Sequence, residues 1–277
     1  EVALNPLGIS KFLHTVTSGY TISAIFVIGI SAWFLIQKRH ILLAKKSIVV
    51  ASAFGLITSA FLLLSGDESA YLAAQKQPMK LAAMEGLYKG EKNAGLVAAG
   101  ILNPAKKLGD ETEPFLLEIK VPYALGIMAN RELDSFTPGI NDLLYGNSEH
   151  NLISVEEKMA KGKVAIEALK NYKEAKKAND ESLMKSSLSN LESNLNFLGY
   201  GYLKDAKDAV PPVALTFYSF HIMVALGTYF IALFAITLYL NLSRKYKFEN
   251  IRAFLWICLF TIPLGYIAAE AGWIVAE

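Results

Sequence analysis

A histidine and a methionine lie in apolar stretches of this sequence, and the side chains of both can bind a metal. His14 stands in KFLHTVTSGY, and Met223 stands in LTFYSFHIMVALGTYFIALFAITLYL, a run without formal charge. Neutral imidazole is a common metal ligand, and a histidine–methionine pair can hold the iron of a low-spin haem. Two other interpretations stay open: Met223 as core filler, and His14 as a headgroup-level residue bonded to water or a carbonyl.

His221 precedes Met223 by two residues, so the two side chains cannot serve one site on one helix face. Each residue of an α-helix turns about 100°, and positions two apart therefore point about 200° away from each other. If either residue is a ligand, its partner comes from elsewhere in the chain.

Three charged residues are further candidates for chemistry. Glu270 lies in the apolar segment GYIAAEAGW, where a lone carboxylate must be paired, protonated or bound to a cation. The alternative interpretation is a carboxyl group near the interface that is hydrogen-bonded to a neighbouring helix. Lys80 and Glu85 lie in QPMKLAAMEGLYKG; five residues correspond to about 140° around a helix, so they do not form a standard surface pair. A solvated loop charge is the simplest interpretation of either one.

Composition indicates a chain divided between lipid and water. Of 277 residues, 53% are hydrophobic and 19% charged, with mean hydropathy +0.33, which is too apolar for an ordinary soluble domain and too charged for a wholly buried one. The 27 basic and 25 acidic residues create no strong field, so no nucleic-acid partner is expected. A single cysteine, Cys258, excludes an intrachain disulfide and a CxxC metal site. Because the chain begins with Glu1 and ends on Glu277 directly after an apolar run, we expect a piece of a larger assembly.

Four runs are long enough to cross about 30 Å of hydrocarbon. They are apolar all round, unlike the amphipathic helices of a soluble core, and span residues 12–36, 47–65, 213–240 and 253–273. The sequence therefore predicts an all-α membrane protein with four transmembrane helices, the first two within residues 1–65 and the last two within 213–277. A large, partly helical extracytoplasmic insert, residues 66–212, separates the two pairs.

The charge of the two short connections sets the predicted topology. QKRHILLAKK and SRKYKFENIR are both cationic, so the positive-inside rule places them in the cytoplasm. The insert and both termini then lie outside. His14 and Met223 fall at comparable depths, within about 10–12 Å at 1.5 Å per residue, and Glu270 falls in the outer half of its helix.

The insert shows two helical segments. SVEEKMAKGKVAIEALKNYKEAKK opens with a capping box of Ser154 and Glu157 and continues in strong helix formers. A second polar helix is expected over residues 180–198. Residues 91–142 contain scattered glycine, proline and asparagine, and we expect them to be irregular.

Several of these segments together resemble subunit I of the cytochrome bd quinol oxidases. They follow that family's order: KFLHTVTSGY, GDES, KLAAMEGLY, VPYALGI, HIMVALG and IAAEAGWIVAE. The resemblance covers the family's fifth to eighth transmembrane spans with the quinol-oxidising loop, and it is weakest over residues 147–208.

The resemblance implies specific roles for the candidate residues. His14 and Met223 match the axial ligands of the low-spin haem b iron, and Glu270 matches the glutamate of the high-spin haem b iron beside haem d. Lys80 and Glu85 match residues of the loop that oxidises quinol. The implied activity is quinol:oxygen oxidoreductase, in the bacterial cytoplasmic (inner) membrane with the insert outside. Implied partners are membrane quinol, molecular oxygen, the remaining part of subunit I, subunit II and small single-span subunits.

The sequence departs from the family pattern in several places. His221 stands where the family usually has arginine, and Tyr266 where it usually has tryptophan. The family's first four spans, with the haem d ligand, and its ninth span are absent, so the chain alone is not expected to reduce oxygen. The alternative is a non-catalytic membrane scaffold or transporter fragment with a partner-binding insert. A transporter predicts inverted repeats or broken helices, and the sequence shows neither.

Overall fold

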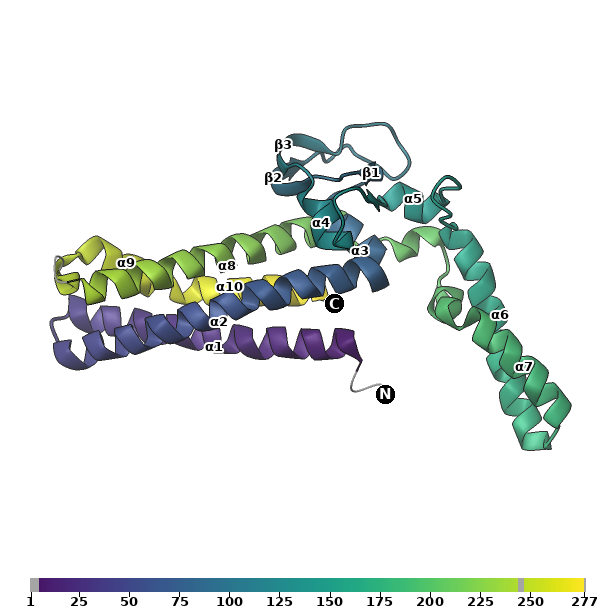
Figure 1. Ribbon diagram of the computed structural model, residues 1–277, viewed down its shortest axis with the longest axis horizontal. Coiled ribbons are helices and arrows are strands. Elements are labelled where there is room, and N and C mark those ends of the chain that lie inside the picture. Colours follow the sequence, from purple (N-terminus) through teal and green to yellow (C-terminus); the bar gives the residue numbers. More distant parts are fainter. Residues whose placement is uncertain (1–4, 244–246, 277) are drawn as a thin grey trace. The chain divides into compact units, whose positions relative to one another are not determined.

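The computed structural model describes residues 5–243 and 247–276, and the chain divides into two compact units (Figure 1). The first unit contains the chain up to Ala73 and from Leu215 onward. The second unit contains the intervening residues, Ala74–Ala214.

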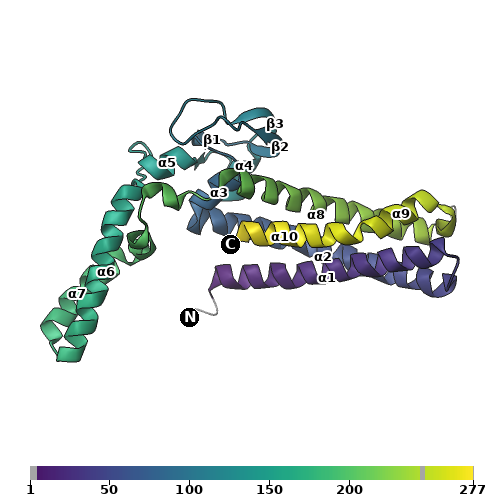
Figure 2. The same cartoon turned by 180° about the vertical axis from the view of Figure 1, so that it is seen from behind.

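The first unit is a bundle of long apolar helices that run alongside one another (Figures 1 and 2). Four helical stretches in the described residues are long and apolar enough to cross a membrane. This finding confirms the predicted fold class, and the four stretches contain the four predicted apolar runs. The helices are α1 (Pro6–Ile36), α2 (Ile41–Lys76), α8 (Val213–Leu242), α9 (Arg252–Phe260) and α10 (Ile262–Ala276).

The fourth span is broken into α9 and α10 at Thr261. Pro263 lacks a backbone N–H and disfavours helical geometry in the residue before it, which explains the interruption. The Thr261 hydroxyl donates to the Ile257 carbonyl at 2.8 Å and lies 2.6 Å from the Tyr229 hydroxyl of α8. These bonds stabilise the break and join it to the neighbouring helix.

Antiparallel packing of α1 and α2 is fixed by pairs of small hydroxyl residues. Ser10 lies 2.8 Å from Ser69, and Thr21 donates to Thr58 at 3.0 Å. Small side chains allow close approach of helices, and hydrogen bonds between them hold in an apolar environment. One contact lies near the start of α1 and the other near its middle, and together they set the register of the pair.

The apolar core of the first unit lies in the half of the bundle that contains α9. Its buried members fall within residues 24–35 of α1, 44–51 of α2, 230–234 of α8 and 248–258. An ion pair at 3.0 Å between Lys45 and Glu249 closes the same end, where η4 (Phe248–Asn250) precedes α9.

The second unit begins with a small mixed α/β region, and the prediction that residues 91–142 are irregular is wrong. β1 (Glu91–Lys92) pairs with β4 (Phe136–Thr137), and β2 (Leu96–Leu102) pairs with β3 (Phe115–Val121), both antiparallel. The strand sequence LVAAGIL lacks the apolar–polar alternation by which a half-buried strand is recognised, and its centre is alanine and glycine, so pairing with β3 determines its conformation. Short helices complete the region: α3 (Pro78–Met84), α4 (Ala124–Asn130) and α5 (Ile140–Tyr145).

The rest of the second unit is helical, as predicted. α6 (Val155–Ala178) starts at Ser154, whose hydroxyl accepts the Glu157 N–H at 3.2 Å. α7 (Glu181–Asn194) packs along α6, followed by the 3₁₀ helices η2 (Leu195–Tyr202) and η3 (Ala206–Ala209). α8 begins directly after the paired prolines at positions 211 and 212.

Candidate functional sites

The His14 imidazole is held in one orientation by α2. The ring is half-buried, and its Nδ1 lies 2.9 Å from the Ser65 hydroxyl oxygen. Ser65 donates its own proton to the Leu62 carbonyl at 3.2 Å, so Nδ1–H is the donor to Ser65. In this tautomer Nε2 keeps its lone pair, and a bond from the second ring nitrogen is the usual support of a metal-binding histidine.

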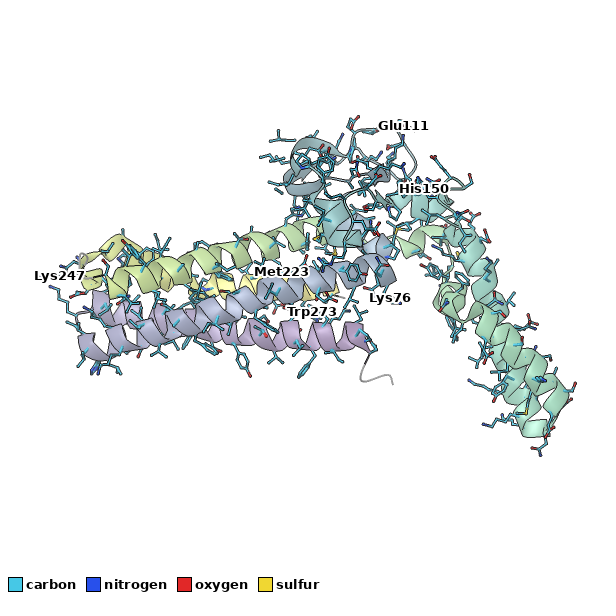
Figure 3. All side chains as sticks on the ribbon, in the orientation of Figure 1. Lys76, Glu111, His150, Met223, Lys247 and Trp273 are labelled. Carbon is cyan, nitrogen blue, oxygen red and sulfur yellow. The ribbon has the colours of Figure 1, made fainter. Side chains whose placement is uncertain are left out.

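Met223 and His221 contact different parts of the bundle, as their spacing predicts. The Met223 sulfur (Figure 3) lies 2.9 Å from the point where a Cβ would stand on Gly272 of α10. His221 instead places Nδ1 2.8 Å from the Phe217 carbonyl of its own helix, with the two rings 4.0 Å apart. Met223 therefore contacts α10 at Gly272.

His14 and Met223 lie at the same depth in the bundle. Phe234 of α8 packs directly on Gly55 of α2, and the two helices are antiparallel. Eleven residues along α8 lead from Phe234 to Met223, and eleven along α2 lead from Gly55 to Gly66. The His14 ring lies against Gly66, with Cε1 3.5 Å from its Cβ position. The two candidate ligands thus stand at one level, on α1 and α8.

The donor set suits a haem better than a bare metal ion. Within the described residues there is no group of three or more His, Cys, Asp or Glu side chains that could hold an ion. A haem needs only two axial ligands from the protein, since the porphyrin supplies four nitrogens. The buried apolar core also stops at Ala24 and Phe230, more than one turn short of His14 and Met223.

Glu270 lies on α10, two residues before Gly272, and its side chain is exposed on this unit. The structure therefore places Glu270 in the same half of the bundle as the histidine–methionine pair. It does not bring the carboxylate into contact with either of them.

Glu85 is buried, so its interpretation as a solvated loop charge is wrong. It follows α3 directly and is 1% exposed, with Oε2 accepting the Val97 N–H at 3.3 Å. Oε1 has no hydrogen-bond partner within the described residues. Burial raises the pKa of the carboxyl to about 7, although the Val97 N–H acts in the opposite direction. A carboxyl that titrates near neutral pH can act as a general base.

Strands β2 and β3 cover the chain next to Glu85. Gly86 has φ of +61°, and Phe115 and Leu102 pack where its Cβ would stand. Lys80 lies within α3, half-buried and five positions before Glu85. Both candidates for quinol oxidation therefore belong to one short helical segment, but they differ in burial.

Three residues at these sites could not be identified from the sequence. Ser65 and Gly272 are small residues near His14 and Glu270, and their contacts depend on helix register. Val97 acts through its backbone N–H, which no side-chain pattern reveals.

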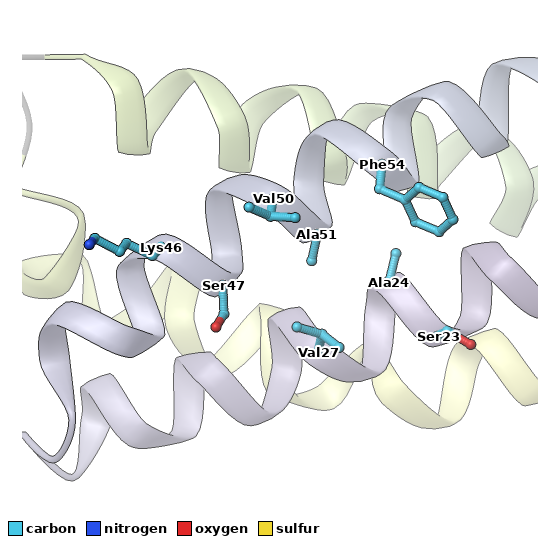
Figure 4. A pocket seen from close by; sticks show the side chains of 8 residues that line it. All are labelled: Ser23, Ala24, Val27, Lys46, Ser47, Val50, Ala51 and Phe54. Atoms are coloured by element: carbon cyan, nitrogen blue, oxygen red, sulfur yellow. The ribbon is translucent and has the colours of Figure 1, made fainter.

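A groove of about 460 Å³ between α1 and α2 lies apart from these residues (Figure 4). None of the candidate site residues lines it. The lining side chains are Ser23, Ala24, Val27, Lys46, Ser47, Val50, Ala51 and Phe54.

Comparison with known proteins identifies the family of this chain. The family described as cytochrome bd terminal oxidase subunit I matches residues 1–277. The chain belongs to this family. It is similar to subunit 1 of the cytochrome bd-II ubiquinol oxidase of Escherichia coli (strain K12), with 32% identity over 294 residues, covering 100% of this chain and 53% of that protein. Subunit 1 of the cytochrome bd ubiquinol oxidase of Bacillus subtilis (strain 168) is 28% identical over 275 residues, covering 99% and 46%.

A solved structure shares the fold of this bd subunit I chain. The bd oxidase from Geobacillus thermodenitrificans aligns with a TM-score of 0.68 and 22% identity, covering 99% of this chain and 47% of that one. The chain spans about half the length of the relatives it matches. The predicted family is confirmed, and the chain is an integral membrane protein.

Proposed function

We propose that this chain is part of the catalytic subunit of a bd-type quinol oxidase. It binds low-spin haem b through His14 and Met223 and oxidises membrane quinol at Lys80 and Glu85. Electrons pass toward a high-spin haem b associated with Glu270 and then toward haem d, where oxygen is reduced to water. The observation that supports this most strongly is the common depth of the oriented His14 imidazole and the Met223 thioether.

The two candidate ligands have different strengths. Ser65 fixes the His14 ring so that Nε2 is directed away from the hydrogen bond, and imidazole is the stronger ligand. Met223 adds a weak thioether ligand on a flexible side chain. A haem held by both His14 and Met223 would supply electron transfer without oxygen binding.

Glu85 supplies the base for quinol oxidation. Quinol loses two electrons, which a haem held by His14 and Met223 would accept one at a time, and two protons, of which the Glu85 carboxylate accepts one and the surrounding water accepts the other. Its pKa of about 7 leaves a large fraction of the group unprotonated at neutral pH. Lys80 donates a hydrogen bond to a quinone oxygen.

Oxygen reduction requires parts beyond this chain. We infer that the remaining part of subunit I carries the haem d ligand, and that subunit II and small single-span subunits complete the assembly. We place the complex in the bacterial cytoplasmic (inner) membrane with the insert on the outer side, because the two short connections are cationic.

Optical spectra of variants in the complete complex test the haem assignment. Met223→Leu keeps the bulk but removes the sulfur, so the reduced low-spin haem b band is expected to disappear while the complex still assembles. His14→Ala is expected to lose the haem itself, whereas Met159→Leu in the insert is the matched control and keeps the spectrum.

His221→Ala tests the rotational argument separately. Because this ring packs on Phe217, the low-spin band is expected to remain. Unchanged spectra in both the His14 and Met223 variants would rule out the ligand pair.

A further inference from the structure

Two buried hydroxyl groups stand at the same level of the α2–α8 interface. Ser52 and Thr237 are each 0% exposed, and neither hydroxyl oxygen has a hydrogen-bond partner within the described residues. Phe234 packs on Gly55, and Ser52 and Thr237 each lie three residues from that contact, toward the same end of the antiparallel pair. Residues three apart share a helix face, so the two hydroxyls occupy facing positions.

Asn241 carries a third buried oxygen of this kind, next along the same face of α8. It lies one turn beyond Thr237, and its side-chain amide donates to the Thr237 carbonyl at 3.1 Å. That bond directs Oδ1 the other way, and Oδ1 is buried without a partner in the described part of the chain. The Cys258 thiol lies within reach of a weak hydrogen bond to the Thr237 side chain; a thiol is a weak donor and acceptor, so this contact leaves most of the hydrogen-bonding capacity of the hydroxyl unused.

An open groove near the Lys45 end of the bundle reaches Asn241. The groove has a volume of about 370 Å³, and Asn241 is one of its lining residues. Its other lining residues are Lys45, Lys46, Val49 and Val50. Asn241 is therefore shared between the open groove and the buried hydroxyls.

We propose that Ser52, Thr237 and Asn241 bind an internal water molecule that enters from the groove beside Lys45 and Lys46. Buried polar oxygens are rarely left unpaired, and an internal water needs two to four polar partners. The path of the water from the groove ends where the Phe234 ring packs on Gly55. This inference rests on the helix packing of the first unit alone and is independent of the proposed function.

The direction of a stability change tests the proposal in the full-length protein with its native partner subunits. Ser52→Ala and Thr237→Val each remove one hydrogen bond to the water, so each is expected to lower Tm by about 2 °C. If the hydroxyls were simply unpaired, their removal would raise Tm or leave it unchanged, and the proposal would be overturned.

The double variant and a matched control sharpen this test. Ser52→Ala combined with Thr237→Val is expected to lower Tm by less than the sum of the single variants, because both act on one water; additive losses would contradict a shared site. Ser59→Ala on the same helix is the control, since its hydroxyl already donates to the Gly55 carbonyl at 2.7 Å, and it is expected to change Tm least. A high-resolution density map is expected to show a water peak within hydrogen-bonding distance of both hydroxyls. A direct bond between them, or no peak, overturns the proposal.

Discussion

The sulfur of Met223 lies against Gly272, 2.9 Å from the point where a Cβ would stand. This contact joins α8 to α10 at the level of the candidate haem site. A glycine at position 272 lets the methionine side chain occupy this space, so the two residues together determine where the thioether lies.

Gly272→Ala is therefore expected to displace the Met223 sulfur while the complex still assembles. The displaced atom is near the end of a flexible side chain, which can move at little cost to folding. We expect a weakened low-spin haem b band and a shifted haem reduction potential, measured by redox titration. Gly227→Ala on α8 is the control, because no atom lies within 4 Å of its Cβ position. Equal spectra for both variants would show that Gly272 does not position the ligand.

Ser65→Ala removes the acceptor that orients the His14 ring. Losing the bond to the second nitrogen of a metal-binding histidine typically weakens binding by about 10–100-fold. The haem-to-protein ratio after purification is expected to fall, although less than in His14→Ala. Ser69→Ala breaks the contact with Ser10 at 2.8 Å and the bond to the Ser65 carbonyl at 2.8 Å, but it leaves the Ser65 hydroxyl in place, so it is expected to keep the full ratio. An undiminished ratio in Ser65→Ala would contradict the orienting role.

Glu85→Gln is expected to lower quinol oxidation strongly and leave the haem spectrum normal. The amide keeps the size of the side chain but cannot accept a proton from quinol. Oxygen consumption with an artificial donor that bypasses quinol should continue, which separates this loss from damage to the haems. Parental quinol oxidation in both Glu85→Gln and Lys80→Ala would place the quinol site elsewhere.

The raised pKa of Glu85 also predicts a pH dependence of stability. The folded carboxyl has a pKa of about 7, against 4.5 for the reference group, so the folded state binds more protons between these values. Stability from this group is therefore full below pH 4.5 and is lost as pH rises to 7, by about 3 kcal/mol. Relative to Glu85→Gln, the parental insert should lose protease resistance between pH 5 and pH 8. Glu111→Gln, at an exposed position, should show the same pH dependence of protease resistance as the parent. If the difference in protease resistance between Glu85→Gln and the parent did not change with pH, a raised pKa of the buried carboxyl would be contradicted.

The sequence predicted the membrane helices well because hydrophobic length alone determines them. The beginnings of α6 and α8 were also predictable, since the Ser154 cap and the paired prolines are local signals. Strand β2 was not predictable, because the alanines and glycine at its centre carry little strand preference and its pairing with β3 is formed across a loop.

The candidate site was only partly predictable, for a related physical reason. The residue types of His14 and Met223 and their positions in the sequence indicate that they can bind a metal. The side chains that contact these two residues depend on helix register. The burial of Glu85 depends on the fold of β2 and β3 over it, which the local sequence does not reveal.

A close backbone contact in the insert joins α6 to η2 and gives the last prediction. Gly162 packs against the backbone of Phe197 and Gly201, with no space for a Cβ on either glycine. Backbone atoms cannot move aside as a flexible side chain can, so Gly162→Ala must separate the two elements.

Overpacking of this kind typically costs about 1–3 kcal/mol. Gly162→Ala is therefore expected to expose the α6–α7 region to proteolysis in the complete complex. Gly199→Ala is the matched control, because no atom lies within 4 Å of its Cβ position, and its digestion pattern should equal the parental one. The haem spectrum should be normal in both variants, since the candidate ligands lie in the other unit. Equal protease resistance of Gly162→Ala and Gly199→Ala would show that the close glycine contact does not hold α6 against η2.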